Sequence, residues 1–562
     1  MVLECCFLIP CKKVSKYRGF FVSLFDYICV RTKKMSIVEG YLAKRLRDHG
    51  VRRFFGIPGG PSIPYMEAFR KAGIEFILTS HEASAAVMAD VTARLTGVTG
   101  VCHATYGPGA TNLSTGIGGA LLDRSPVLAL TSEMPDAWLG RIVQMNIDHQ
   151  ALYKPITKAT FRLSVGNACE VIGESLMIAN REYPGPVHIG LPSDLTEKRI
   201  TIPEKTNKVT DKSPGYHIDD RIRVLLASSR RPVIAAGLTA MRKGAGDGLR
   251  KFLETCKVPV VVTPMAKGII PSGHPCYAGV LFHALSDRLK NLTQEADLVI
   301  GLGYDPVEYN YESWLHHVPL VHMDTVPADV LPSGAMQVVS GPESWFQILA
   351  PLRSSPSMVS LAGEARGNIS RELISATKGF TPATALSVLR HMLPEHTVVT
   401  ADVGSHLHLI GQMWDVTDSG RLIMTNGWSS MGFGLPAAIA AALVNRTLPV
   451  VCITGDGGFM MNAGEMMTAR RYGLKIIVVV LADGELNLIR VKESWKNVKS
   501  YGTKLYNGSL FGSATFLGAE VIHVTDRKGM QTAVSRALLS DRSVIIEAAV
   551  DPAVYGDLIV KS

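Results

Sequence analysis

Short runs of apolar, often β-branched residues alternate along this chain with longer stretches whose apolar positions recur at helical spacing. Such runs lie at residues 100–104, 232–236, 296–302, 448–454 and 475–481. Strands that alternate with helices form parallel sheets with helices on both faces. The pattern therefore predicts an α/β fold built from doubly wound parallel sheets.

Two polar stretches divide this pattern into three blocks. Residues 203–214 and 353–368 are rich in Pro, Ser, Lys and Asn, which is typical of linkers. Residues 1–34 show neither a helix pattern nor a strand pattern of apolar residues, and we expect them to be a disordered extension. We expect the first helix to begin at Met35. The predicted doubly wound domains are 35–205, 215–352 and 370–562.

Two acidic motifs follow consecutive predicted strands of the third block. Gly455-Asp456-Gly457-Gly458 comes after residues 448–454, and Asp483-Gly484-Glu485 comes after residues 475–481. The carboxyl ends of parallel strands are where α/β sheets bind ligands, and glycine lets backbone N–H groups approach an anion. Hard oxygen ligands beside such a loop predict a magnesium–diphosphate site. The glycine motif alone would equally fit an ordinary turn or a degenerate nucleotide fingerprint.

A further carboxylate lies far upstream, at the end of a different predicted strand. Glu82 follows the predicted strand 75–79 and precedes a helix of small residues at 83–95. A carboxyl group in an apolar pocket is suited to proton transfer, because burial raises its pKa. The alternative is a solvated residue at the start of a helix, where the helix dipole favours a negative charge.

Together these motifs resemble those of the acetohydroxyacid/acetolactate synthase family of thiamine-diphosphate (ThDP) enzymes, which has a pyruvate-decarboxylase-like architecture. Residues 151–158 and 302–309, together with aspartate at position 483, are closer to the flavin-free catabolic acetolactate synthases. The matching segments are Gly56-Ile-Pro-Gly-Gly60, His81-Glu82, Tyr106-Gly-Pro-Gly-Ala-Thr-Asn112, Asp402-Val-Gly404 with His406, Met431-Gly-Phe-Gly-Leu-Pro436 and Gly455-Asp-Gly457.

The resemblance implies a role for particular residues. Magnesium would be held by the side chains of Asp456 and Asp483 and by the backbone carbonyl of Glu485. Glu82 would bind the aminopyrimidine ring of ThDP and drive its imino tautomer. His406 with His408 would also suit a metal pair, but no third ligand accompanies them. The other implied cofactor-binding residues are Pro58, Gly59, Asn112, Ser405, His406, Met431, Gly457 and Gly458.

Two further residues are candidates for the substrate pocket, which makes them catalytic candidates beside Glu82. Gln144 matches a family glutamine that faces the substrate from the adjacent chain; otherwise it is an ordinary polar loop residue. Lys492 stands where relatives place a glutamine, and a cation there would favour a more anionic substrate. The alternative is that Lys492 is a solvated charge on the outer face of its helix.

The implied activity is ThDP- and Mg²⁺-dependent decarboxylation of a 2-oxo acid, pyruvate above all, followed by carboligation to 2-acetolactate. ThDP would span a subunit interface in a homodimer or a dimer of dimers. Three alternatives stay open: a decarboxylase or lyase acting on a more anionic 2-oxo acid, a flavin- or nicotinamide-binding oxidoreductase, and an inactive regulatory homologue. Gly301-Leu-Gly303 is only a fragment of a dinucleotide fingerprint, so FAD is not expected.

Composition excludes other classes of protein. Residues 1–34 carry five of the nine net positive charges, and no run of five basic residues occurs, so a nucleic-acid partner is not expected. No stretch of 18 apolar residues predicts a membrane span. The cysteines outside residues 1–34 are dispersed, without a CxxC motif, which favours a reducing compartment and a cytoplasmic location.

Overall fold

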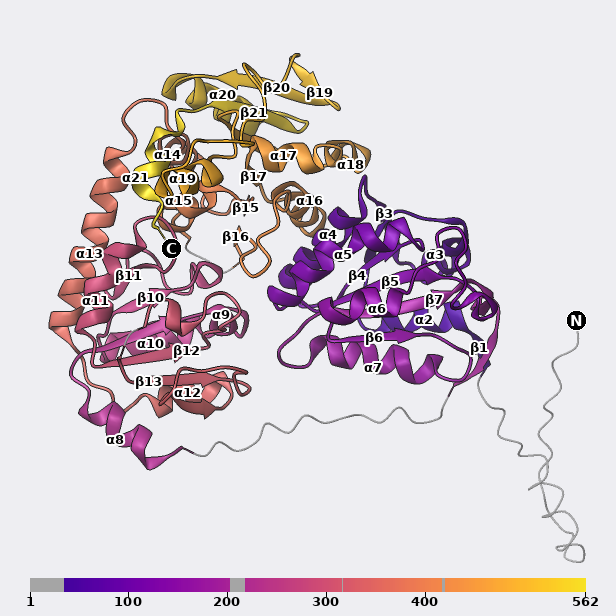
Figure 1. Cartoon of the computed structure of the whole chain (residues 1–562), viewed down its shortest axis with the longest axis horizontal. Coiled ribbons are helices and arrows are strands. Elements are labelled where there is room, and N and C mark those ends of the chain that lie inside the picture. Colours follow the sequence, from indigo (N-terminus) through magenta and orange to yellow (C-terminus); the bar gives the residue numbers. More distant parts are fainter. Residues whose placement is uncertain (1–34, 203–217, 316, 417–419, 562) are drawn as a thin grey trace, which may run out of the picture.

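The computed structural model describes residues 35–202, 218–315, 317–416 and 420–561. The predicted N-terminal extension, residues 1–34, and the first predicted linker, residues 203–214, lie outside these ranges. Three large sheets organise the described chain into three α/β domains (Figure 1). No helix in the described part is long and apolar enough to cross a membrane.

The first domain is a six-stranded parallel sheet in the order β3-β2-β4-β5-β7-β6. Alternate residues of its strands enter two separate cores: Phe54 packs with one set of helices, and Phe55 with the other. The strands are β2 Arg53–Gly56, β3 Glu75–Leu78, β4 Gly100–Ala104, β5 Val127–Glu133, β6 Ala159–Arg162 and β7 Val187–Pro192. The helices are α2 Val38–Asp48, α3 Ile63–Lys71, α4 Glu82–Thr96, α5 Pro108–Leu122, α6 His149–Tyr153 and α7 Ala168–Asn180.

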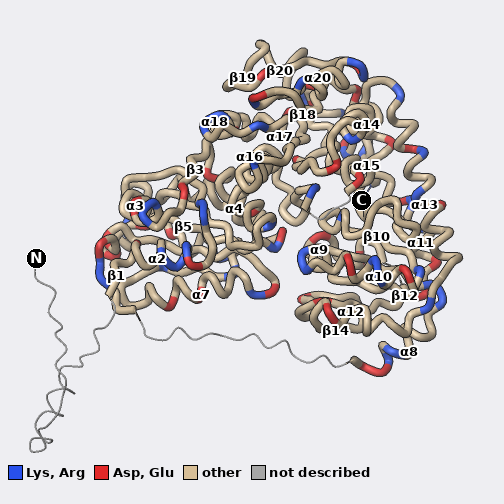
Figure 2. The backbone as a smooth tube through the Cα atoms, turned by 180° about the vertical axis from the view of Figure 1, so that it is seen from behind, with Lys and Arg blue, Asp and Glu red and all other residues tan. Residues whose placement is uncertain are grey.

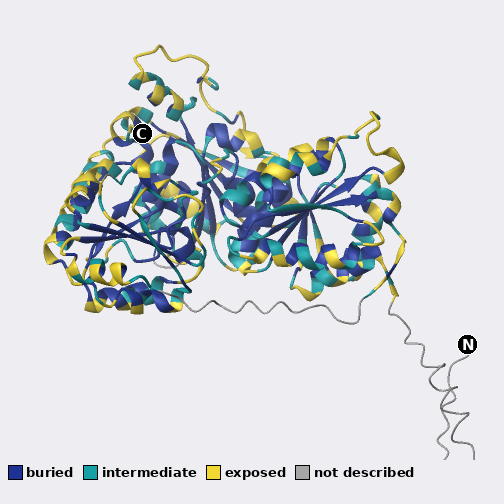
Figure 3. Ribbon diagram, turned by 60° about the horizontal axis from the view of Figure 1, so that its bottom comes forward, coloured by how far each residue is buried: buried dark blue, intermediate teal, exposed yellow. Residues whose placement is uncertain are grey.

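The middle domain is also a six-stranded parallel sheet, but its order is β11-β10-β9-β12-β13-β14. All of its strands except the edge strand β14 are buried on both faces, as crossover helices require (Figure 3). The strands are β9 Pro232–Ala236, β10 Val260–Val262, β11 Tyr277–Val280, β12 Leu298–Leu302, β13 Leu320–Asp324 and β14 Met336–Val339. The helices are α8 Asp220–Ser228, α9 Leu238–Arg242, α10 Gly246–Thr255, α11 Lys290–Glu295 and α12 Pro342–Ile348.

The third domain has a seven-stranded sheet in the order β16-β15-β17-β18-β21-β20-β19, parallel except for the short edge strand β19. The strands are β15 Val398–Ala401, β16 Leu422–Ile423, β17 Val450–Gly455, β18 Ile477–Ala482, β19 Thr515–Phe516, β20 Ala519–Val524 and β21 Val544–Ala549. The helices are α14 Pro382–Met392, α15 Ser405–Met413, α16 Gly434–Val444, α17 Asp456–Asn462, α18 Glu465–Arg471, α19 Asn487–Trp495, α20 Arg527–Leu539 and α21 Tyr555–Leu558.

The predicted fold class is therefore confirmed, with three local corrections. The first helix begins at Val38, because residues 35–37 form strand β1 (Met35–Ile37), which pairs with β8 (Arg199–Thr201). The second predicted linker is largely helical: α13 (Pro356–Ser375) begins at a proline, buries one face and packs beside β11. The predicted helix after Asp456 is two helices, α17 and α18.

Small residues bring the first and third domains into close contact. α4 and α16 pack against each other, and alanines of both helices share one buried cluster. Ser80 and His81 of the first domain donate backbone N–H bonds to the carboxylate of Glu465 in the third, at 2.9 and 3.0 Å. The carboxyl ends of the two sheets are thus held in one fixed arrangement.

Charged residues of both signs are interspersed along the backbone (Figure 2).

Candidate active site

The carboxyl edge of the third sheet has a switch point between β15 and β17. From β15 the chain passes to β16 on one side, and from β17 it passes to β18 on the other. Such a point leaves a crevice above the strand ends, where open α/β sheets bind ligands. Helices α15 and α17 begin at this crevice, so their first N–H groups are directed toward it.

Asp456 is the first residue of α17, and the loop after β18 is bonded to it. One carboxylate oxygen accepts a bond from the N–H of Gly457 at 2.8 Å. The other accepts bonds from Gly484 N–H at 2.7 Å, Asp483 N–H at 3.2 Å and the Tyr506 hydroxyl at 3.0 Å. The structure therefore brings Asp456 and Asp483 together, as the sequence predicted from the two strand ends.

This edge concentrates negative charge in a buried place. Burial, and then the charge of Asp456, raises the pKa of Asp483 to about 7. Glu485 follows at the same loop, and its side chain accepts a bond from Thr503 at 2.6 Å. Two adjacent carboxyl groups repel each other when both are ionised. A divalent cation bound between their oxygens would stabilise the ionised pair.

Two buried polar atoms beside this loop lack a partner. Ser405 Oγ and His406 Nε2 have no hydrogen-bond partner within the described part of the chain. The His406 ring lies next to Gly455, 3.3 Å from the position that a Cβ there would occupy. Buried polar groups are normally bonded, so these two atoms indicate a polar ligand. The residues present fit a magnesium–diphosphate group.

The glycines of the motif are required by close packing. A Cβ on Gly457 would lie 3.0 Å from Leu486 and 3.1 Å from Met431, and a Cβ on Gly458 would lie 2.7 Å from an Asp402 carboxylate oxygen. The side chain of Met431 therefore reaches the start of α17, beside the predicted diphosphate loop.

The first sheet presents Glu82 at its own carboxyl edge. Glu82 is the first residue of α4, is 7% exposed and accepts a bond from the Asn112 amide at 3.0 Å. A Cβ on Gly109 would lie 3.3 Å from the other Glu82 carboxylate oxygen, and a Cβ on Gly59 would lie 2.3 Å from Thr105 Oγ1. The structure thus brings Gly109 and Asn112 against Glu82, and Gly59 against the neighbouring Thr105. Pro58 is exposed in the same loop as Gly59.

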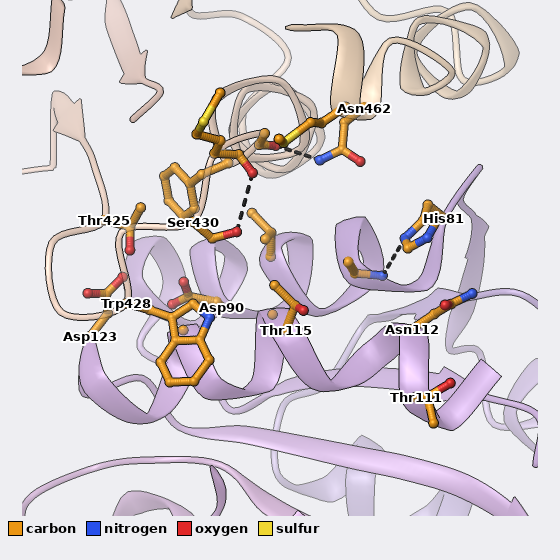
Figure 4. Close-up of a pocket in the computed structure, with 18 residues that line it drawn as sticks. His81, Asp90, Thr111, Asn112, Thr115, Asp123, Thr425, Trp428, Ser430 and Asn462 are labelled. Atoms are coloured by element: carbon orange, nitrogen blue, oxygen red, sulfur yellow. Dashed lines mark hydrogen bonds between the residues drawn. The ribbon is translucent and has the colours of Figure 1, made fainter. Parts of the chain in front are cut away.

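A cavity of about 310 Å³ lies between the first and third domains (Figure 4). Its first-domain wall is formed by α4 and α5 and includes His81 and Asn112. Its third-domain wall includes Met431, Asn462 and Trp428, whose ring covers Gly118 of α5. Two predicted cofactor-binding residues from different domains, Asn112 and Met431, therefore line one cavity.

The two predicted substrate residues are exposed in the single chain. Gln144 lies on the loop 139–148, beside Met145, whose carbonyl closely approaches Gly107. Lys492 lies on α19, exposed. Burial lowers the pKa of His408 to about 4, and the nearby positive charge of Lys492 also lowers it. The His408 ring lies edge-on against the His283 ring. Among the described residues, His408 is not part of a group of three or more side chains placed to bind a metal.

Several residues at these edges were not predicted. Tyr506, Asp402 and Glu465 are all bonded to the loops described above. Asp402 accepts bonds from Val403 N–H, Gly432 N–H and the Thr454 hydroxyl. Asp402 was visible as part of a matching motif; Tyr506 and Glu465 reach the site from segments whose pattern carried no such signal.

The corresponding edge of the middle sheet is filled by its own side chains. Glu308 accepts bonds from Leu238 N–H at 3.3 Å and Met265 N–H at 3.0 Å, and burial raises its pKa to about 8. Gly301 is needed because a Cβ there would lie 1.9 Å from the Tyr311 hydroxyl. The glycines of the dinucleotide fragment therefore serve packing, and the first N–H of α9 is bonded to the carboxylate of Glu308.

Three family models match the chain in the order of its domains. Residues 38–152 match the N-terminal TPP-binding domain of thiamine pyrophosphate enzymes, thiamine pyrophosphate being ThDP. Residues 220–343 match the central domain of these enzymes, and residues 402–548 match their C-terminal TPP-binding domain. The fold, the Glu82 edge and the acidic edge thus define a thiamine-diphosphate enzyme.

Curated relatives narrow this class. Isozyme 2 of the acetolactate synthase large subunit from Escherichia coli K12 is 30% identical over 91% of this chain and 95% of its own length. A probable acetolactate synthase large subunit from Methanocaldococcus jannaschii is 29% identical, over 91% of each chain. Acetolactate synthase from Bacillus subtilis is 28% identical over 90% of this chain and 92% of its own length. The chain belongs to the acetolactate synthase family.

Proposed function

We propose that this enzyme decarboxylates pyruvate and joins the two-carbon unit to a second 2-oxo acid, giving 2-acetolactate when pyruvate is the acceptor. The observation that carries the proposal is the coexistence of two edges: Glu82 bonded to Asn112, and Asp456 bonded to the Asp483 loop beside the unpartnered Ser405 and His406. An inactive regulatory homologue would have no need to retain both.

The acidic edge would hold Mg²⁺ and the cofactor's diphosphate. Asp456 and Asp483 supply carboxylate oxygens, and Glu485 supplies its backbone carbonyl. Five further residues would surround the diphosphate and the bent cofactor: Gly457, Gly458, Ser405, His406 and Met431. When bound, ThDP supplies the electron sink that makes loss of carbon dioxide from a 2-oxo acid possible.

The first-domain edge would bind the cofactor's pyrimidine and move its proton. Glu82 is buried, so its carboxyl group is shielded from water, and Asn112 fixes one of its oxygens at 3.0 Å. Gly59 and Gly109, with Pro58 at the rim, let their loops pack closely against Thr105 and Glu82, beside the place proposed for the ring. A carboxyl group held in this way acts as the proton donor and acceptor of the site.

A second copy of the chain would complete the site. The loop that carries Gln144 exposes large apolar side chains, which water-exposed loops rarely do. We expect a homodimer, or a dimer of dimers, in which this loop and Gln144 cover the partner's pocket. These exposed side chains are Trp138, Leu139, Ile142, Met145 and Ile147.

The same reasoning extends to the remaining properties. Glu308 supports a flavin-free enzyme of the catabolic subgroup, because its carboxylate already accepts the middle-domain N–H groups. The cysteines of the described residues are free thiols, which supports a cytoplasmic location. We place the domain limits at 35–205, 215–352 and 370–562, with residues 1–34 dispensable.

A second candidate activity uses a more anionic 2-oxo acid. Its support is the position of Lys492, close enough to His408 to lower the pKa of that ring, on the helix that follows Asp483. An extra carboxylate, phosphonate or sulfonate on the substrate would then face a cation.

Product analysis separates these activities. Incubation with pyruvate, ThDP and Mg²⁺, followed by NMR, should show 2-acetolactate. Acetaldehyde without 2-acetolactate would identify a decarboxylase instead. No turnover of pyruvate, with turnover of a dianionic 2-oxo acid, would favour the second candidate.

A further inference from the structure

A buried chain of hydrogen bonds in the first domain ends on the backbone of Gly107, outside the groups used so far. His149, the first residue of α6, approaches the Gly107 N–H through Nε2 at 3.2 Å. Its Nδ1 lies 2.9 Å from Thr131 Oγ1, and that oxygen lies 2.7 Å from His188 Nε2. His149, Thr131 and His188 are all buried, on α6, β5 and β7.

The chain continues through β6 to a buried ion pair. His188 Nδ1 lies 2.7 Å from Thr160 Oγ1, which donates to Gln150 Oε1 at 2.7 Å. The Gln150 amide then donates to Glu133 at 2.6 Å. Glu133 also accepts a bond from Arg162.

Both ends impose the same direction on every bond between them. A backbone N–H can only donate, so His149 Nε2 accepts the bond from Gly107 and Nδ1 carries the ring proton. Nδ1–H therefore donates to Thr131 Oγ1, and the Thr131 hydroxyl donates a hydrogen bond to His188 Nε2. At the other end a carboxylate can only accept, so Gln150 presents its amide to Glu133 and its carbonyl to Thr160. The two assignments agree, which fixes the tautomer of both histidines.

The same geometry argues against a metal in this place. Ligand atoms of Glu133, His149 and His188 lie within 4.8 Å of one another. Each histidine lone pair, however, already accepts a hydrogen bond, from Gly107 N–H or from the Thr131 hydroxyl. A cation would have to displace these bonds and would also face the guanidinium of Arg162.

Gly107 is the residue that this chain holds, and it leads directly into the Glu82 site. It precedes α5, which carries Gly109 against one oxygen of Glu82 and Asn112 against the other. Its φ of 66° and the nearby carbonyl of Met145 leave no room for a side chain. A displacement at Gly107 would therefore move both contacts of Glu82.

We propose that His149, oriented by the Thr131–His188–Thr160–Gln150 chain, is a positioning residue that fixes the start of α5 and through it the carboxyl group of Glu82. The inference rests on the proposed proton-transfer role of Glu82.

Burial keeps the ring of His149 neutral. Burial lowers the pKa of His149 to about 4; Asp148 opposes this effect, and Arg162 adds to it. Burial also lowers the pKa of His188 well below its usual value, and the neighbouring His149 lowers it further. Both rings are thus neutral near pH 7, the form in which His149 can accept from Gly107.

The test removes one hydroxyl from the middle of the chain. Thr131→Val is nearly isosteric but can neither accept from His149 nor donate to His188. Hydrogen exchange of the peptide covering residues 105–112 should become about tenfold faster, and kcat for 2-acetolactate should fall about tenfold. KM for pyruvate and the affinity for ThDP should change by less than about twofold, because the third-domain edge proposed to hold Mg²⁺ and the diphosphate is untouched.

Matched variants separate positioning from general destabilisation. Thr131→Ser keeps the hydroxyl and should restore both exchange and kcat. Thr397→Val removes a buried hydroxyl that lacks a hydrogen-bond partner in the described chain, and should behave as wild type. If Thr131→Val does not fold, Thr160→Val breaks the chain one step further away and should show a smaller change of the same kind.

Two outcomes would overturn the proposal. One is wild-type exchange and kcat in the Thr131→Val enzyme. The other is faster exchange spread equally over all three domains, which would show lost stability and not a displaced loop. If the wild-type enzyme makes no 2-acetolactate, the proposed function fails, yet the exchange of residues 105–112 still decides whether His149 holds the loop.

Discussion

Six strands of the third domain, all but β19, repeat the strand order of the first domain, but the two sheets have different chemistry at the same edge. In each sheet the second strand from the edge and its inner neighbour form the switch point: β2 with β4, and β15 with β17. After β17 the chain places Asp456, whereas after β4 it places Gly107-Pro108-Gly109. The fold therefore decides where a ligand can bind, and the loop residues decide which half of it binds.

Electrostatics sharpens this difference. The third-domain edge accumulates buried carboxyl groups: burial raises the pKa of Asp402 to about 6 and that of Asp483 to about 7. The first-domain edge combines the carboxyl group of Glu82 with neutral rings, since burial lowers the pKa values of His103 and His149 to about 4. The proposed Mg²⁺ therefore belongs at the third-domain edge, and the proposed pyrimidine ring at the first-domain edge.

The largest expected effect is at the first-domain edge. Glu82→Gln should leave ThDP affinity nearly unchanged and lower kcat by roughly 10²–10⁴, the usual contribution of a proton-transfer group. Calorimetry and steady-state kinetics measure the two quantities. Turnover close to wild type would remove Glu82 from the mechanism and would break the division of labour between the edges.

The complementary effect is at the third-domain edge. Asp456→Ala and Asp483→Ala should each weaken Mg²⁺-dependent ThDP binding by more than about 100-fold, because a lost oxygen ligand leaves the diphosphate charge uncompensated. Glu485→Gln is the control, since only its backbone carbonyl is expected to bind the metal. Titration calorimetry with equal affinities in all three variants would contradict the metal assignment.

A third prediction concerns pH and the buried Asp402. Its folded-state pKa is raised to about 6, so the native state binds more protons than the unfolded chain between about pH 4 and pH 6, and stability falls as pH rises through this range. Asp402→Asn should remove that fall, worth at most about 3 kcal/mol.

Asparagine suits the site, because its carbonyl can keep the bonds from Val403 and Gly432 and its amide can donate to Thr454. Calorimetric melting between pH 4 and pH 7 measures the effect. An identical pH dependence in wild type and variant would show that Asp402 does not titrate there.

The smallest expected effect is on specificity. Lys492→Gln should shift the preference from dianionic 2-oxo acids toward pyruvate by only about two- to fivefold, because an exposed charge acts through water. Lys499→Gln, also exposed, is the control. Unchanged kcat/KM values across several 2-oxo acids would leave Lys492 as a solvated charge.

Periodic features were predictable from the sequence, whereas long-range contacts were not. Residues 100–104 and 232–236 form the predicted strands β4 and β9, since their apolar runs are local. The helical start expected at Met35 was wrong because residues 35–37 pair with residues 199–201, far along the chain. The linker expected at 353–368 is largely helical, because one side of α13 is apolar enough to pack beside β11.

The same distinction applies to the site. Asp456 and Asp483 could be paired in advance, because consecutive parallel strands must end side by side. Tyr506 and Glu465 could not, since their partners are fixed only by tertiary packing. The roles of Gln144 and Lys492 depend on surfaces that the single chain leaves exposed, so they stay predictions.

The bond from Ser80 N–H to Glu465 has a consequence for biosynthesis, since its ends are 385 residues apart. At about 5–20 residues per second, a ribosome needs roughly 20–80 s to supply the carboxylate after Ser80 has been made. During that interval the N–H groups of Ser80 and His81 lack the carboxylate that they bond in the folded chain. The segment that leads into α4 therefore completes its hydrogen bonds only after Glu465 has been translated.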